Sequence, residues 1–141
     1  MAAHRGRIVT NHIKLWPRAV FDLKPGKGSK GSDADTINGL LSGPGVYILY
    51  RDDQPYYVGK ASQKLFHRLR RHASSPRDRY YNFWNFFSAF VIPNKKYIPE
   101  VEGILIASMP TDNSSVMRIK KIHLPRRVAT LLRKQSLIRE E

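Results

Sequence analysis

The chain has no cysteine among its 141 residues. Disulfides and thiolate metal sites are therefore excluded. No apolar run approaches the ~18 residues that a membrane-spanning helix needs, and the N-terminus lacks the apolar segment of a signal peptide. These absences predict a cytoplasmic protein with no membrane partner.

Acidic residues are scarce relative to basic ones. The chain has 25 Lys and Arg against 11 Asp and Glu, a net charge of +14. Most of the excess lies near the ends, with +6 in residues 1–30 and +6 in residues 116–141, while residues 31–115 carry only +2. This charge predicts a polyanionic partner.

The length predicts one folded domain with a modest core. A Gly/Ser/Lys stretch at residues 24–32 is typical of a flexible linker. We therefore expect a basic N-terminal arm and linker at 1–36, a folded core at 37–115, and a basic, helical C-terminal arm at 116–141. Both arms are expected to contribute affinity for DNA.

Two short tyrosine motifs lie ten residues apart. Gly45-Val46-Tyr47 opens one apolar run, and Tyr57-Val58-Gly59 ends a second run. The residues between them, Arg51 to Pro55, favour a turn, so the two runs are expected to form a β-hairpin. In a hairpin of this length, Tyr47 and Tyr57 can face one groove.

Further elements follow the hairpin. Apolar spacing predicts a helix at about 63–74, and aromatic and β-branched residues predict a strand at 86–92. Another helix is expected from Pro99 to Pro110, and a last one from about Pro125 to Leu132. The order predicts an α+β fold, with a small three-stranded antiparallel sheet flanked by helices in the order ββαβα.

Several of these elements carry residues suited to phosphodiester hydrolysis. That reaction needs an activated water, charge neutralisation on the phosphate and help for the leaving oxygen. Tyr47 and Tyr57 could position or deprotonate the water. A free tyrosine has a pKa of about 10, so nearby cations would have to lower it. The alternative is that both tyrosines are packing residues.

The helix after the hairpin is strongly basic. Arg68 and His72 are four residues apart and share a helical face. Arg68 is expected to bind the scissile phosphate through its planar guanidinium, and His72 to shape or protonate the same site. Further cations are expected to bind the DNA backbone: Lys60, Lys64, Arg70 and Arg71. The alternative is a solvated basic face.

Glu102 is an isolated carboxylate on an otherwise apolar helix. A buried carboxylate needs a partner or a metal ion, and Mg²⁺ takes one or two carboxylates plus waters and substrate oxygens. We therefore expect Glu102 to bind Mg²⁺ or Mn²⁺. The alternative is an ion pair with Lys60 or Arg68. Asn113 follows in a polar turn and is a further candidate site residue.

The ordered set of motifs resembles the GIY-YIG nucleases, from about Gly43 to Asn113. The resemblance implies a metal-dependent DNA endonuclease, with one divalent ion and no covalent intermediate. It also implies that one tyrosine acts on the water. We take Tyr47 as the base and Tyr57 as its helper, with the opposite assignment left open. His72 and the Ile-Pro-x-x-Glu setting of Glu102 resemble the restriction-endonuclease branch more than the excision-repair branch.

Two other functions are compatible with the charge. One is a non-catalytic nucleic-acid-binding protein, in which basic arms bind phosphate and the tyrosines only pack. The other is a structural or assembly protein, which gives no account of Glu102. No pattern in the sequence indicates an oligomeric state.

Overall fold

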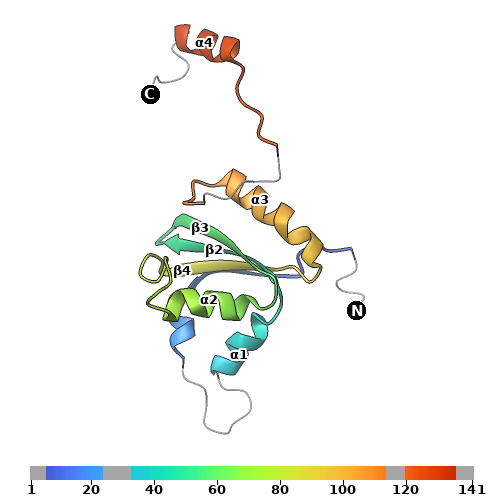
Figure 1. Cartoon of the computed structure of the whole chain (residues 1–141), viewed down its shortest axis with the longest axis vertical. Coiled ribbons are helices and arrows are strands. Elements are labelled where there is room, and N and C mark those ends of the chain that lie inside the picture. The colour runs from blue at the N-terminus through green and yellow to red at the C-terminus, as the bar shows by residue number, and fades with distance from the viewer. Residues whose placement is uncertain (1–5, 24–32, 114–119, 136–141) are drawn as a thin grey trace.

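A four-stranded antiparallel sheet forms the centre of the fold (Figure 1). The computed structural model describes residues 6–23, 33–113 and 120–135. The strands are β1 (Asn11–Pro17), β2 (Gly45–Arg51), β3 (Gln54–Ala61) and β4 (Phe86–Val91). Their order in the sheet is β1-β4-β2-β3, and every neighbouring pair is antiparallel. The central pair, β2 and β4, is therefore protected on both sides.

The sequence predicted three strands, and β1 is the strand that it missed. Ile13 pairs with Ala89, and the register then shifts before Trp16. At this bulge Leu15 has φ +52°, and its N–H donates to the Ser88 hydroxyl at 3.1 Å. The bulge interrupts the alternation of apolar residues, which is the signal by which a strand is recognised. β1 lies within residues 1–36, which were predicted to be an arm and linker, while the division of the chain into arms and core stays a prediction.

Helices cover both faces of the sheet (Figure 1). One face carries η2 (Arg18–Asp22), α1 (Asp33–Leu40) and α2 (Leu65–Ser74). The other carries η3 (Lys95–Tyr97) and α3 (Ile98–Ser108). The α+β class and the predicted hairpin, third strand and two helices are confirmed.

The alternation of β2 divides the apolar residues between these two faces. Tyr47 and Leu49 point to the α2 side, while Val46 and Ile48 point to the α3 side, and all four are buried. β2 is consequently buried on both faces. A tyrosine within such a strand must find a partner for its hydroxyl inside the protein.

The last helix, α4 (Arg126–Lys134), lies where the sequence predicts one. None of its residues is buried, and Val128 and Leu131 are exposed. In the part of the chain that the structure describes, no helix is long and apolar enough to cross a bilayer.

Candidate active site

Tyr47 is the most deeply buried member of the predicted site, with 1% of its surface exposed. Its ring lies over Gly59, the residue that it faces across the β2–β3 ladder. A Cβ at Gly59 would overlap the end of this ring, including the hydroxyl oxygen. A Cβ at Gly45 would overlap the carbonyl oxygen of Phe90. The two glycines of the tyrosine motifs therefore make room for the ring and for the neighbouring strand.

Tyr57 lies on the same face of the sheet as Tyr47, as the hairpin predicted. The two ring centroids are 6.3 Å apart. Tyr57 stacks on Tyr80 with a centroid distance of 4.3 Å, and it is only partly buried. Tyr47 is thus the inner tyrosine of the pair and Tyr57 the outer one.

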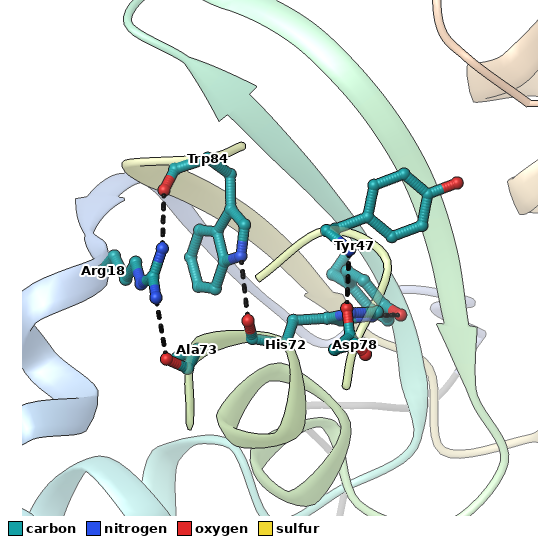
Figure 2. Close-up of polar contacts among 7 residues, drawn as sticks. Arg18, Tyr47, His72, Ala73, Asp78 and Trp84 are labelled. Carbon is teal, nitrogen blue, oxygen red and sulfur yellow. Dashed lines mark hydrogen bonds and ion pairs between the residues drawn. The ribbon is translucent and has the colours of Figure 1, made fainter. Parts of the chain in front are cut away.

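Helix α2 brings His72 directly onto Tyr47. The helix buries Leu65, Leu69 and Ala73 at helical spacing, and His72 lies on the same side. The Tyr47 hydroxyl and His72 Nε2 are 2.7 Å apart in a buried hydrogen bond. On the other side of the ring, His72 Nδ1 lies 2.8 Å from Asp78 Oδ1 (Figure 2). Tyrosine, histidine and aspartate thus form a continuous hydrogen-bonded chain.

The environment of Tyr47 raises its pKa well above the usual value. Burial is the main cause, and the neighbouring Tyr57 and Asp78 add to it. Arg68 opposes the rise through its charge and a side-chain hydrogen bond. A phenolate base at neutral pH would need cations that lower this pKa, but burial outweighs the effect of Arg68. At neutral pH Tyr47 therefore keeps its proton, which it can donate to His72.

The pKa of His72 is shifted in the opposite direction, below its usual value. Burial is the main cause, because it penalises the charged imidazolium. Arg68 and Arg71 lower it further, while the hydrogen bond and charge of Asp78 raise it. His72 is therefore favoured as a neutral imidazole near neutral pH, and a neutral imidazole can accept one proton.

Arg68 lies one turn before His72 on α2 and is exposed to solvent. Its charge acts on Tyr47, Tyr57 and His72. An exposed guanidinium beside a buried tyrosine can bind an anion that approaches the site from solvent. This geometry suits the predicted binding of the scissile phosphate.

A basic groove of about 460 Å³ opens beside Arg68. It lies between the end of β3, helix α2 and the start of α3. Its cationic and histidine lining residues are Lys60, Lys64, His67, Arg68, Arg71 and Lys95. Three of the four predicted DNA-binding residues thus line the groove. The fourth, Arg70, lies outside it, with its guanidinium 5.9 Å from the Phe66 ring.

Glu102 lies on α3, with 16% of its side chain exposed. Its Oε1 is 3.8 Å from Lys60 Nζ, a long ion pair whose lysine side is 54% exposed. Burial is the main cause of the raised pKa of Tyr57, and the charge of Glu102 adds to it, which puts the carboxylate within electrostatic range of Tyr57.

Glu102 is the candidate ligand for a metal ion at this site. Within the described residues, no group of three or more His, Cys, Asp or Glu could enclose a metal ion. A single carboxylate still fits Mg²⁺, because this ion commonly keeps several waters and binds one or two carboxylates plus substrate phosphate. Glu102 is the residue that would hold it.

Asn113 contacts β3 rather than the tyrosines. Its Oδ1 accepts the Val58 N–H at 3.0 Å, and its Nδ2 donates to the Val58 carbonyl at 2.8 Å. The Asp112 N–H donates to the Tyr56 carbonyl at 2.7 Å. Because β3 is an edge strand, backbone groups on its outer side have no neighbouring strand within the described residues. These bonds satisfy some of them. In this arrangement Asn113 fixes the strand that carries Tyr57.

Sequence reasoning missed Arg18, a residue that holds the end of α2. The Arg18 guanidinium donates to the Ala73 carbonyl at 2.8 Å and to the Trp84 carbonyl at 3.3 Å (Figure 2). Trp84 in turn donates its indole N–H to the His72 carbonyl at 3.4 Å. Arg18 therefore ties the backbone around His72 to the segment before β4.

Other residues missed at the sequence level are Asp78, His67 and Lys95. Asp78 lies in the loop after α2 and Lys95 in η3, and only the tertiary fold brings Lys95 close to α2. His67 adjoins Arg68 in the sequence, so its position beside the predicted phosphate-binding residue was the one available signal.

A family model describes part of this arrangement. The model of the GIY-YIG catalytic domain matches residues 43–109. The match includes both tyrosine motifs, α2 and all of α3, and ends before Asn113. No curated protein and no solved structure matches the chain. A GIY-YIG catalytic domain is thus found at residues 43–109, and it indicates a nuclease that acts on DNA.

Proposed function

We propose that this chain is a metal-dependent DNA endonuclease that hydrolyses phosphodiester bonds through a tyrosine-assisted water attack. The single observation that carries the proposal is the 2.7 Å hydrogen bond between the buried Tyr47 hydroxyl and His72 Nε2. It provides a route for the proton that an attacking water must lose. The GIY-YIG match at residues 43–109 supplies the reaction class.

The raised pKa of Tyr47 and the neutral His72 favour a relay over a free phenolate base. As the water oxygen bonds to phosphorus, the water proton passes to the Tyr47 oxygen. The Tyr47 proton passes at the same time to His72 Nε2. The bond from phosphorus to the leaving oxygen then breaks, and that oxygen takes a proton from solvent. The relay ends with an imidazolium at His72, and solvent later removes its extra proton.

Other residues bind the substrate and its charge. Arg68 holds the scissile phosphate, because a guanidinium can donate two parallel hydrogen bonds to it. Glu102 holds the divalent ion, Mg²⁺ or Mn²⁺. When bound, such an ion neutralises charge on the phosphate and stabilises the leaving oxygen. Tyr57 orients the water or the phosphate at the outer side of Tyr47.

The basic groove binds the DNA backbone on the approach to this site. Its cations come from β3, α2 and the turn before α3, and they all line the same groove. The position of His72 one turn after Arg68 favours the restriction-endonuclease branch of the family. A non-catalytic binding protein would need the groove, but it would not need the buried hydrogen-bonded chain of Tyr47, His72 and Asp78.

Cleavage of supercoiled plasmid by the purified protein tests the proposal. We expect nicked or linear product with Mg²⁺ or Mn²⁺ and none with EDTA. Glu102→Gln keeps the size of the side chain and removes its charge, so it should abolish cleavage while a gel shift shows retained binding. The matched control is Glu100→Gln, since Glu100 lies on the same helix and is exposed. Undiminished cleavage in EDTA would refute the metal requirement.

A further inference from the structure

Asp78 lies in the loop between α2 and β4, with 10% of its side chain exposed. Its Oδ1 accepts two hydrogen bonds, from the His72 ring at 2.8 Å and from the Tyr80 N–H at 2.9 Å. Its own backbone N–H donates to the Ser75 carbonyl at 3.0 Å. The carboxylate is therefore held in place by its own loop while it contacts the histidine.

This contact decides which nitrogen of His72 carries the proton. An ionised carboxylate can only accept hydrogen bonds, so the neutral ring must carry its proton on Nδ1. Nε2 then presents a lone pair to the Tyr47 hydroxyl, 2.7 Å away. In the opposite tautomer, lone pairs of Nδ1 and Oδ1 would face each other at 2.8 Å, which is repulsive.

We propose that Asp78 is a positioning residue for cleavage: it holds His72 in the tautomer that receives the Tyr47 proton, and it stabilises the imidazolium that forms. The proposal rests on the proposed nuclease function. Asp78 itself exchanges no proton in the relay. Its part resembles that of the aspartate in a serine-protease triad, with a tyrosine hydroxyl in place of the serine.

Within the part of the chain that the structure describes, Asp78 is the one acidic group among those whose charge acts on His72. Those groups are Asp78 in the loop and Arg68 and Arg71 on α2. The other rings within contact range are Tyr47 from β2, Tyr57 from β3 and Tyr80 from the loop. Of these groups, Asp78 alone carries a negative charge that can accept a hydrogen bond from Nδ1–H.

Two substitutions together separate this role from loop anchoring. Both hydrogen bonds end on Oδ1, so in Asp78→Asn an oxygen in that place can keep the Tyr80 N–H, the loop shape and the Nδ1 proton while the negative charge is lost. Asp78→Ala also removes the acceptor, so nothing then holds the proton on Nδ1 and it can move to Nε2. Nitrogen-15 NMR of the imidazole reads this change directly in protein without DNA or metal. The matched control is Asp53→Asn, because Asp53 is exposed in the β2–β3 turn.

We expect His72 to be protonated on Nδ1 in the wild type and in Asp78→Asn, and on Nε2 in Asp78→Ala. Single-turnover cleavage by Asp78→Ala should fall by about 10²-fold or more, since a wrong tautomer costs about 10⁴ in a serine protease. DNA affinity should stay unchanged. Residual activity should persist to lower pH, because the charge that raises the pKa of His72 is gone.

Three results would overturn the proposal. They are a wild-type ring protonated on Nε2, an unchanged tautomer in Asp78→Ala, and a switched tautomer with normal cleavage. The wild-type spectrum decides the first even if the variant fails to fold. A wild-type protein that cleaves no DNA overturns the nuclease function and Asp78's part in it. In that case the spectra still decide whether Asp78 sets the protonation of His72.

Discussion

Tyr47→Phe removes one hydroxyl and leaves the ring that packs over Gly59. The change deletes the buried hydrogen bond to His72 Nε2 and leaves that nitrogen unpaired. The cost in unfolding free energy should be about 1–3 kcal/mol. A protein with a typical stability of roughly 5–15 kcal/mol stays folded after such a loss. The stability of this variant is therefore expected to fall measurably, with the fold retained.

The loss of cleavage should be much larger than unfolding could explain. A positioned acid–base group contributes about 10²–10⁴ in rate, which corresponds to about 2.7–5.4 kcal/mol in the barrier. Single-turnover cleavage at saturating protein measures this loss, and thermal melts measure the stability. Tyr57→Phe is the matched control, because Tyr57 is only partly buried and lies outside the Tyr47–His72–Asp78 chain. It should lose less rate and less stability.

The pH dependence of the wild type separates a relay from a phenolate base. His72 must be neutral to accept a proton, and its pKa lies below the usual 6.5. Cleavage should therefore be constant above that range and fall as pH drops through the pKa of His72. A phenolate at Tyr47 would instead give a rate that climbs towards pH 10 and beyond, because burial raises its pKa. That climb, or full activity in Tyr47→Phe, would refute the relay.

Two further substitutions test the rest of the site. Arg68→Lys keeps the charge but loses the planar fork, so we expect a barrier increase of about 2.7–4 kcal/mol, as for a lost transition-state donor; near-normal turnover would support a solvated basic face instead. Gly59→Ala forces a methyl group into the Tyr47 ring, which should cost about 1–3 kcal/mol of stability and reduce cleavage. Gly39→Ala is its control, because its Cβ meets open space on a helix and should be neutral or stabilising.

The local parts of this fold could be predicted from the sequence. The two apolar runs and the turn between them gave the hairpin, and helical spacing gave α2 with its buried face. These patterns depend on residues close together in the chain. They predicted that Tyr47 and Tyr57 face one groove and that His72 lies on one side of α2 with Leu65 and Leu69.

The missed features depend on contacts between distant segments or on a break in a pattern. β1 was missed because its bulge at Leu15 interrupts the alternation. Asp78 was missed because only the return of its loop brings it to the His72 ring. The raised pKa of Tyr47 could not be predicted, because sequence proximity shows the cations but not the burial that outweighs them.

β1 and Arg18 both precede residue 43, where the family match begins. A fragment cut to the matched range would lose the edge strand beside β4 and the guanidinium that ties α2 to Trp84. The exposed edge of β4 would become a template for strand pairing between copies. A fusion of this domain to a DNA-binding protein should therefore start upstream of Asn11, and a shorter fragment is expected to aggregate.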